Sequence, residues 1–445
     1  MVLRRTLLNL ALVCFLVAPA WADESPSADG LKPGDVLDQS NWQKAQGLLP
    51  PEILKHYQAG EYVNRIVDWP VEQYNWPPDF VEASKRNEGR FALNEQGSII
   101  EKDTGKQPPY IMGHPFPTID PKDPAAAVKI MWNYFYKNWY LGTAHNESEL
   151  LWVGPHAIDR RADVESDWQP FDGAPARELL PNNTQGLVYR NLSLARSPAD
   201  LNGIASLVWR YKDPEKRDST WTYVPALRRV RAVSPANRSD GFLGSDMSQD
   251  DSNYFDGKVE DFTWRLVGEV DQFRFVDPFS LKGQYNLTWL AAGGWSTAWP
   301  ELKFLGYMDP AWKGSAWAPV AEALAKRRHW VVEAVPKEKY YLFGKLEFYL
   351  DKLTYQGSWQ RKFGWQGELL ADSQVAAFLL APSKRPDGAV DYNIASNQSF
   401  YCVENTKRNQ STLAGIKPSP NSQFYARIVF DPNLFEVSSL SRFGK

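Results

Sequence analysis

One stretch of the chain holds side chains whose types and spacing could do chemistry. A strand-like run ends in three arginines, Arg228, Arg229 and Arg231, and a Gly-Phe-Leu-Gly-Ser-Asp turn that ends at Asp246 follows it. Because a guanidinium fork suits carboxylates and phosphates, these side chains could guide an anionic head group or an acidic partner surface at a rim of the fold. Alternatively, the arginines pair with Asp246 and the aspartates after it, and such pairs contribute little stability where they are exposed.

The acidic residues after this turn raise the question of a metal site. The run that starts at Asp246 lacks the glycine at position six and the glutamate at position twelve of an EF-hand loop, which excludes that motif. An irregular calcium site in residues 246–261 stays open beside the simpler interpretation, a solvated acidic turn. The five histidines are scattered and form no paired ligand motif. We therefore predict no metal and no cofactor, with calcium left as the open alternative.

Enzymatic motifs are equally sparse. The sequence has no G-x-S-x-G elbow, P-loop or G-x-G-x-x-G fingerprint. The lone cysteine of the mature chain, Cys402, is interpreted as a buried small hydrophobe rather than a nucleophile. A carboxylate pair for glycoside hydrolysis stays possible because the two acids need not be near in sequence, and the 19 tryptophans would suit sugar stacking. We expect no catalytic residues, with a carbohydrate-active hydrolase as the alternative.

The charge and the N-terminus point to export. Arg4 and Arg5 precede an apolar run, Leu7 to Val17, and an Ala-x-Ala site ends at Ala22, which is the pattern of a cleaved secretory signal. Cys14 lies inside the apolar run, too early for a lipoprotein signal, so we predict cleavage after Ala22 without lipidation. The net charge of −3 argues against a nucleic-acid partner. No later segment is apolar enough to span a membrane, so we predict a soluble mature protein.

The elements that position these residues are one long helix and a series of strands. Asp123 and Pro124 start a predicted helix over 124–141, which carries an apolar stripe and ends at Gly142. Residues 23–120 before it are predicted to be a helical and Trp/Pro-rich segment that wraps the main body.

From about residue 150 the apolar period changes to two, which is typical of strands with one apolar and one polar face. Short connections between these strands favour antiparallel pairing. A short helix is expected from Pro319 to Arg328. The candidate strands are 150–158, 185–196, 203–212, 219–233, 262–276, 284–291, 329–336, 340–350, 353–363, 374–381 and 423–430.

Four segments carry a resemblance to a known family. They are Thr-Tyr-Val-Pro-Ala-Leu-Arg-Arg-Val-Arg (222–231), the Gly-Ser-Asp turn (244–246), Trp-Val-Val-Glu-Ala (330–334) and the segment 345–352. Together they resemble the LolA/LolB-like group of Gram-negative periplasmic proteins, the outer-membrane lipoprotein-sorting type. More narrowly, they resemble its long branch with a domain of unknown function, which is often found beside export pumps and outer-membrane proteins. The family turn usually continues with aromatic and acidic residues, whereas Met-Ser-Gln (247–249) intervenes here.

The resemblance implies an α+β, mostly β fold. In this fold a strongly curved antiparallel sheet, an incomplete barrel, is closed by helices over an apolar cavity. It divides the chain into a signal peptide (1–22), the wrapping segment (23–120) and an open-barrel domain (121–435), with helix 124–141 as the lid.

The same resemblance implies a periplasmic, non-enzymatic carrier or chaperone for a hydrophobic or lipidic ligand. Its expected partners are an inner-membrane export pump and an outer-membrane protein, with transient contact to a membrane surface; a scaffold protein of an export system is a further alternative. The side chains expected to line the cavity are Met131, Trp132, Phe135, Trp209, Trp221, Tyr223, Trp264, Leu266 and Phe348.

Overall fold

The structure is a computed structural model. It describes residues 30–69, 76–175, 183–278, 280–282, 287–298, 323–378, 383–391, 397–416 and 423–443. The predicted signal peptide lies outside the described residues. Among the helices within these ranges, none is long and apolar enough to cross a membrane.

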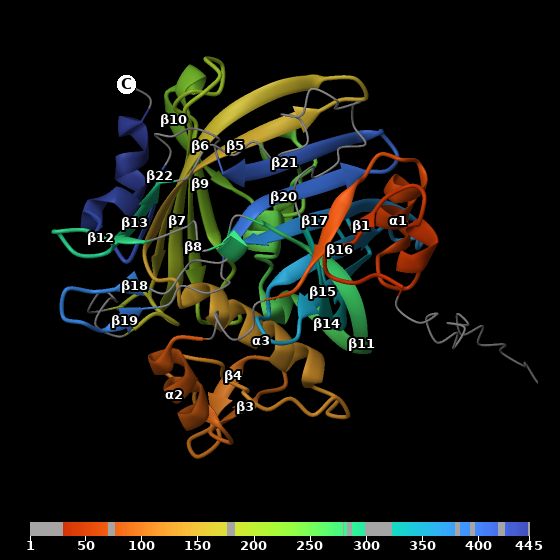
Figure 1. Cartoon of the computed structure of the whole chain (residues 1–445). Coiled ribbons are helices and arrows are strands. Elements are labelled where there is room, and N and C mark those ends of the chain that lie inside the picture. The colour runs from red at the N-terminus through yellow and green to blue at the C-terminus, as the bar shows by residue number, and fades with distance from the viewer. Residues whose placement is uncertain are drawn as a thin grey trace, which may run out of the picture.

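A single large, strongly curved sheet dominates the molecule (Figure 1). Thirteen of its strands follow one another in an unbroken antiparallel series, which confirms the predicted mostly β, antiparallel architecture. In order across the sheet they are β10 (Arg229–Val233), β9 (Ser219–Val224), β8 (Ala205–Tyr211), β7 (Leu187–Ala195), β6 (Ile158–Pro170), β5 (Ala144–Val153), β21 (Gln410–Ile416), β20 (Asn397–Asn405), β17 (Leu369–Phe378), β16 (Gly357–Phe363), β15 (Lys345–Asp351), β14 (Ala323–Pro336) and β11 (Phe262–Val276).

Shorter strands extend this series at its sides. The N-terminal pair joins the sheet through a parallel ladder with β14, and a second group joins it beside β5. These strands are β1 (Val36–Leu37), β2 (Asn64–Val67), β12 (Thr288–Trp289), β13 (Trp295–Ala298) and β22 (Gln423–Ala426). Two separate hairpins, β3–β4 (Phe91–Leu93, Ile99–Glu101) and β18–β19 (Ser383–Lys384, Val390–Asp391), complete the described strands.

In the described ranges the α-helices are few. They are α1 (Pro51–Gln58), α2 (Pro78–Asn87) and α3 (Ala126–Trp139). The predicted helix 124–141 is α3, shortened by two residues at each end; the Asp123 carboxylate accepts from the amide of Ala125 at 2.8 Å. Helix α3 packs against the concave face of the sheet with Ile130, Met131 and Phe135 buried. The α2 segment and the β3–β4 hairpin lie together next to α3 (Figure 1).

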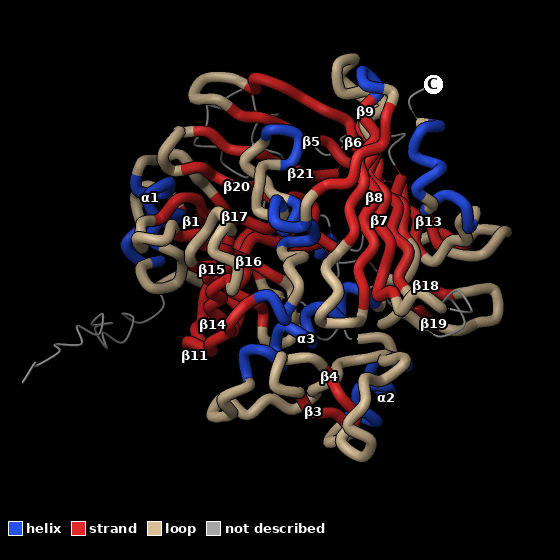
Figure 2. The backbone as a smooth tube through the Cα atoms, turned by 180° about the vertical axis from the view of Figure 1, so that it is seen from behind, coloured by secondary structure: helices blue, strands red, loops and turns tan. Residues whose placement is uncertain are grey.

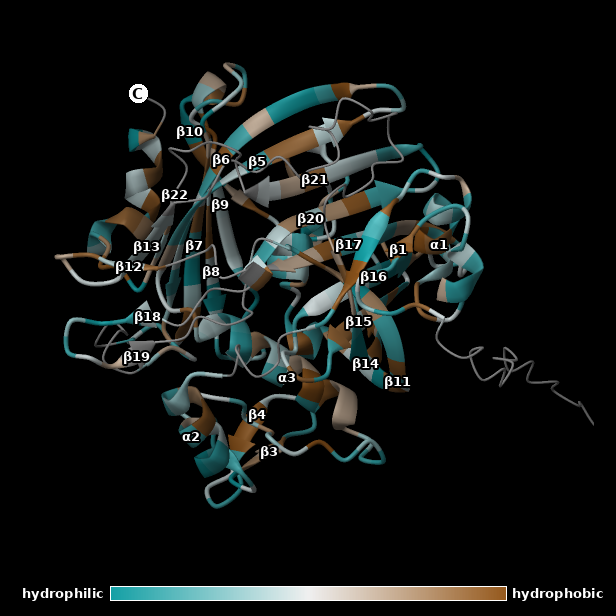
Figure 3. Ribbon diagram, viewed as in Figure 1, coloured by the Kyte–Doolittle hydropathy of each residue, from teal (hydrophilic) through white to brown (hydrophobic). Residues whose placement is uncertain are grey.

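Both faces of the sheet are covered, so the expected polar face does not meet water as predicted. On β15, Phe348 belongs to the core under α3, whereas its neighbour Tyr349 belongs to a second core under the N-terminal segment. Glu347, expected on a solvated face, is only 5% exposed. Along β6, hydrophobic residues are interspersed among hydrophilic ones (Figure 3).

Two terminal segments cover the convex face. Residues 30–69, with α1, pack over the second core, and residues 432–443 pack over β7, β8 and β9, where Phe435 and Leu440 are fully buried. In the N-terminal cover, His56 lies 2.8 Å from a carboxylate of Glu61 and 2.8 Å from one of Glu404 on β20. The pair with Glu404 links the N-terminal cover to strand β20 of the sheet.

We expect the His56 attachment to make stability depend on pH. Burial on its own lowers the pKa of His56. The carboxylates of Glu404 and Glu61 outweigh this effect and raise that pKa from 6.5 to about 10. The folded state therefore holds a proton that the unfolded chain releases. This contribution is fully present below pH 6.5 and is lost as the pH rises toward 10.

The test is urea unfolding of the native protein and of His56→Gln between pH 6.5 and 9. At pH 6.5 the variant should lose on the order of 3 kcal/mol, and its stability should decline less steeply with pH. A variant that keeps the native slope would contradict the assignment to His56.

Several element predictions were wrong. The expected helix from Pro319 to Arg328 is, in its described part, the start of β14, where residues 323–336 pair along β11. The long partner strand outweighs the local helical preference of an Ala- and Leu-rich run. The expected strand 150–158 spans a turn, because β5 ends at Val153 and β6 begins at Ile158. Strands β20 and β21 were not predicted.

Candidate functional site

The chain between β10 and β11 does not stay at the sheet edge but enters the concave side. We call residues 238–261 the inner segment; its short helical turns lie at the centre of the molecule (Figure 2). Tyr254 and Phe255 are each 1% exposed. The Tyr254 hydroxyl donates to the Trp359 carbonyl at 2.7 Å, and the Tyr134 hydroxyl of α3 donates to the Phe255 carbonyl at 2.9 Å.

A buried ionic network holds the inner segment in place. Arg238 bonds Asp250 at 2.6 Å within the segment and Asp218 at 2.5 Å outside it. Arg210 of β8 bonds Asp218 at 2.8 Å and Asp256 at 3.1 Å. Although burial on its own raises it, the two guanidinium groups hold the pKa of Asp218 below its usual value. The prediction of a solvated acidic turn was wrong, because Asp250 is 3% exposed.

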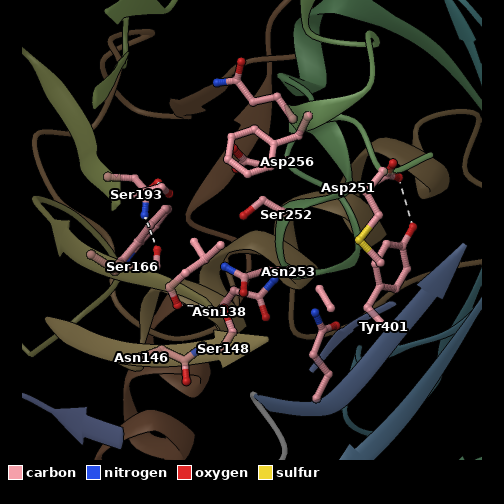
Figure 4. Close-up of a pocket in the computed structure, with 18 of the residues that line it drawn as sticks. Asn138, Asn146, Ser148, Ser166, Ser193, Asp251, Ser252, Asn253, Asp256 and Tyr401 are labelled. Atoms are coloured by element: carbon pink, nitrogen blue, oxygen red, sulfur yellow. Dashed lines mark hydrogen bonds between the residues drawn. The ribbon is translucent and has the colours of Figure 1, made fainter. Parts of the chain in front are cut away.

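A cavity of about 310 Å³ lies between the inner segment, α3 and the concave face of β5–β8 (Figure 4). This volume falls at the lower end of the range of about 300–1,000 Å³ typical of small-molecule sites. Its apolar lining is Phe135, Trp139, Leu141, Ala144, Leu150, Val164, Trp168, Tyr189, Val208, Phe242, Met247, Phe255, Tyr401, Ala414, Gly415 and Phe424. Its polar lining is Asn138, Asn146, Ser148, Ser166, Asn191, Ser193, Ser206, Ser248, Gln249, Asp251, Ser252, Asn253, Asp256 and Gln398.

Four of the polar residues form one row across the sheet. Asn146 of β5 faces Ser166 of β6, Ser166 faces Ser193 of β7, and Ser193 faces Ser206 of β8. Directly opposed residues of an antiparallel pair lie on the same face, so all four side chains point toward the cavity. We call these four residues the polar row. It continues through Thr222 of β9, which does not line the cavity, to Arg231 of β10.

The polar row retains hydrogen-bonding capacity. Asn191 lies two residues before Ser193 on β7 and faces the same side. Its amide donates to the Ser166 hydroxyl at 3.0 Å, and the Ser193 hydroxyl donates to the Asn191 side-chain oxygen at 3.2 Å. Within the described part of the chain, the side chains of Asn146 and Ser206 have no hydrogen-bond partner. The row therefore presents both donors and acceptors to the cavity.

Two carboxylates also line the cavity, and both are already engaged. Asp251 bonds Lys362 at 2.5 Å and accepts from the Tyr401 hydroxyl at 2.9 Å. Asp256 bonds Arg210 and accepts from the Tyr189 hydroxyl at 2.5 Å. Each of the two carboxylates is thus paired with a basic side chain and a tyrosine hydroxyl.

The carboxylates of the acidic loop bear on the calcium alternative. Among the residues that the structure describes, no group of three or more His, Cys, Asp or Glu side chains is placed to hold a metal ion. The carboxylates of the loop turn instead to basic side chains; Asp246 bonds Arg408, and Asp250 bonds Arg238. The arrangement gives no support to the calcium alternative.

The structure separates the residues predicted to line the cavity. Phe135 lines it, and Phe135 and Trp132 also line a smaller void of about 40 Å³. Met131, Trp264, Leu266 and Phe348 lie in the core of the concave side.

Three further predicted residues belong to the convex face. Trp209, Trp221 and Tyr223 lie under the C-terminal cover, and the Trp209 indole donates to the Phe435 carbonyl at 3.1 Å. They are thus placed on the opposite side of the sheet from the cavity.

The predicted rim arginines lie together, but Asp246 does not pair with them. Arg228 ends a short 3₁₀ helix at the β9–β10 turn with φ 49°, and Arg229 and Arg231 follow on β10. All three are exposed, and none forms an ion pair with a described residue. The predicted pairing with Asp246, Asp250 and Asp256 was therefore wrong. Asp246 instead lies against Arg408.

Sequence reasoning missed the polar row. The signal was present, because Asn191 and Ser193 on β7 alternate with Leu192 and Leu194. We instead expected large apolar side chains, such as Trp209 and Trp221 of the neighbouring strands, to line the cavity. Those tryptophans and the leucines of this alternation share one face of the sheet. They lie under the C-terminal cover.

The chain belongs to the DUF1329 family, which is described as a protein family of unknown function and matches residues 36–440. This confirms the long branch with a domain of unknown function that the sequence motifs indicated. No match was found among the curated proteins.

Solved structures with similar chains include a proposed outer membrane lipoprotein-sorting protein domain from Vibrio parahaemolyticus. It has 15% identity and a TM-score of 0.42, and covers 71% of this chain and 97% of its own. A DUF1329 family protein from Desulfovibrio piger has 15% identity and a TM-score of 0.42, covering 70% and 98%. A LolA superfamily protein from Nitrosomonas europaea has 8% identity and a TM-score of 0.38, with the same coverages, 70% and 98%. The family match alone carries the assignment.

Proposed function

We propose that this protein is a periplasmic, non-enzymatic carrier that shields a lipidic ligand from water. The observation that supports it is the cavity between the inner segment, α3 and the concave face of the sheet. Phe135, Trp139 and Phe424 give this cavity apolar walls. Removing an apolar chain from water there contributes roughly 25 cal/mol per Å² of buried apolar surface. The ligand leaves when a partner at the outer membrane binds it more tightly.

The carrier proposal has a direct test. The mature protein is purified, extracted with organic solvent and analysed for lipids by mass spectrometry, and a fluorescent fatty acyl probe is titrated against it. We expect a co-purified lipid or displacement of the probe. Repeated preparations that hold no lipid and bind no probe would overturn the proposal.

The same preparation distinguishes the two alternatives. A carbohydrate-active hydrolase would turn over chromogenic glycosides and lose that activity when one of its two catalytic carboxylates is replaced. A scaffold would co-purify with an export pump or an outer-membrane protein while holding no ligand.

We propose that the exposed arginines of the β9–β10 turn dock the carrier on an anionic membrane surface during delivery, near its pump and outer-membrane partners. Three arginines that form no ion pair with a described residue lie within four positions, Arg228 to Arg231. Each basic residue near an anionic membrane contributes about 1 kcal/mol.

Charge reversal tests this docking role. In Arg229→Glu with Arg231→Glu, we expect the binding of probe to the protein to be unchanged. Association with vesicles that contain anionic lipid should fall by at least about tenfold. Arg65→Glu, at an exposed arginine on β2, is the matched control and should have little effect. Equal losses in the two proteins would contradict a role for the turn.

A further inference from the structure

The cavity is lined by polar as well as apolar side chains, and this mixture indicates which class of ligand it can hold. Of the lining residues that the structure describes, nearly half are polar, and only Asp251 and Asp256 among them are acidic or basic. The amide and hydroxyl groups are contributed by the sheet, by α3 and by the inner segment. Apolar side chains of α3 and β22, such as Trp139 and Phe424, line the same space. The cavity therefore suits a molecule with both an apolar and a polar part.

The charges in the lining favour an uncharged polar part. Among the described residues that line the cavity there is no lysine, arginine or histidine. A phosphate or carboxylate head group would thus lose its hydration without gaining a cation. A cationic head group would meet two carboxylates whose charge Lys362 and Arg210 already balance.

The polar row sets the kind of contact that such a part can make. Its four side chains come from four adjacent strands, so they extend over about 14 Å at the usual strand spacing. Asn146 offers an amide that donates and accepts, and Ser206 offers a hydroxyl that bonds no described residue. An aliphatic ligand covering these groups would leave them without partners, which is unfavourable. A ligand with several hydroxyl or amide groups would satisfy them.

An aromatic surface lies beside the row. Trp168 of β6 and Tyr189 of β7 both line the cavity, with ring centroids 4.0 Å apart and a tilt of 32°. Trp168 faces Asn191, the residue that links two members of the row. A flat or ring-shaped part of a ligand could pack there while its hydroxyl groups reach the row.

We infer that the carried ligand is an amphiphile whose polar part is uncharged and bears hydroxyl or amide groups, held along Asn146, Ser166, Ser193 and Ser206. This inference rests on the proposed carrier function and narrows it to a class of ligand. The apolar part of the ligand packs on Phe135, Trp139 and Phe424. Its polar part exchanges hydrogen bonds with the row.

The experiment compares three amphiphiles with the same acyl chain: a monoacylglycerol, the free fatty acid and the lysophosphatidic acid. Each competes with a fluorescent acyl probe on the native protein. We expect the monoacylglycerol to displace the probe at about a tenfold lower concentration than either anionic competitor. Equal or tighter displacement by the anionic competitors would overturn this inference and leave the carrier function standing. Failure of all three, with no probe bound, would overturn the carrier function itself.

Variants of the row provide the second arm. In Asn146→Leu with Ser193→Val, we expect affinity for the monoacylglycerol to fall about tenfold or more while the fatty acid binds as before. Thr222→Val is the matched control, since Thr222 continues the row on β9 outside the cavity. A control that loses as much affinity as the row variant, or a row variant that loses none, would overturn the assignment.

Discussion

Replacing Arg238 by methionine should lower the free energy of unfolding by about 3–5 kcal/mol, the usual result of breaking a buried ion pair on one side. Arg238 is 7% exposed and bonds Asp250, Asp218 and the Asp256 carbonyl. Its loss leaves three acidic side chains with Arg210 as the only arginine in the network. Equilibrium unfolding in urea measures the change.

The matched control is Arg265→Met. Arg265 also pairs with a glutamate, Glu333, at 3.1 Å, but its side chain is 66% exposed. Exposed pairs contribute at most about 1 kcal/mol, so the control should stay close to the native stability. Because the network anchors the inner segment, Arg238→Met should also weaken retention of an acyl probe, whereas Arg265→Met should not. Similar losses in the two variants would contradict a special role for the buried network.

The parts of the fold that were predicted correctly are those fixed by local signals. Helix α3 was placed to within two residues at each end because Asp123, Pro124 and Gly142 mark its limits and its apolar stripe has a helical period. Strand β11 was predicted with its observed bounds because Phe262, Trp264 and the residues after them alternate clearly. Family membership followed from short motifs that need no tertiary information.

The site depends on information that local patterns do not carry. An alternating sequence predicts that a strand has two different faces. When both faces are buried, the alternation does not tell which face lines the cavity. Trp209 and Val208 lie on opposite faces of β8, and the larger side chain belongs to the C-terminal cover. Apolar content therefore pointed to the wrong side of β7–β9. On the opposite side, smaller and more polar residues of β7 and β8 line the cavity.

The inner segment was missed for a related reason. An acidic run is normally solvated, and only distant partners make its burial possible. Arg210 lies 46 residues before Asp256, and Lys362 lies 111 residues after Asp251. Nothing in the residues near the turn indicates these pairings. A single sequence thus predicts most of the strands and helix α3 but not the inner segment on the concave side.

Gly357 leaves room for the inner segment to pack against β16. A larger residue at this position should displace the inner segment. A methyl group added at Gly357 would lie 2.4 Å from the ring of Tyr254. The ring cannot easily move, because the Tyr254 hydroxyl donates to the Trp359 carbonyl and accepts from the Tyr349 amide at 3.1 Å. We expect Gly357→Ala to cost about 1–3 kcal/mol through overpacking. Asn253 and Phe255, which flank Tyr254, line the cavity, so probe binding should weaken as well.

A double-mutant cycle shows whether this contact is the cause. Tyr254→Ala alone should cost about 3–5 kcal/mol, because it empties a fully buried ring site. In that background the methyl group of Gly357→Ala enters vacated space, so its added cost should be close to zero. The coupling between the two changes should then be about 1–3 kcal/mol, as expected for residues in contact. Tyr254→Phe, which keeps the ring and loses both hydrogen bonds of the hydroxyl, should cost about 1–3 kcal/mol and leave the Gly357→Ala penalty intact. If Gly357→Ala costs as much in the Tyr254→Ala background as in the native protein, its loss of stability comes from strain elsewhere on β16. The contact with the inner segment is then not the cause.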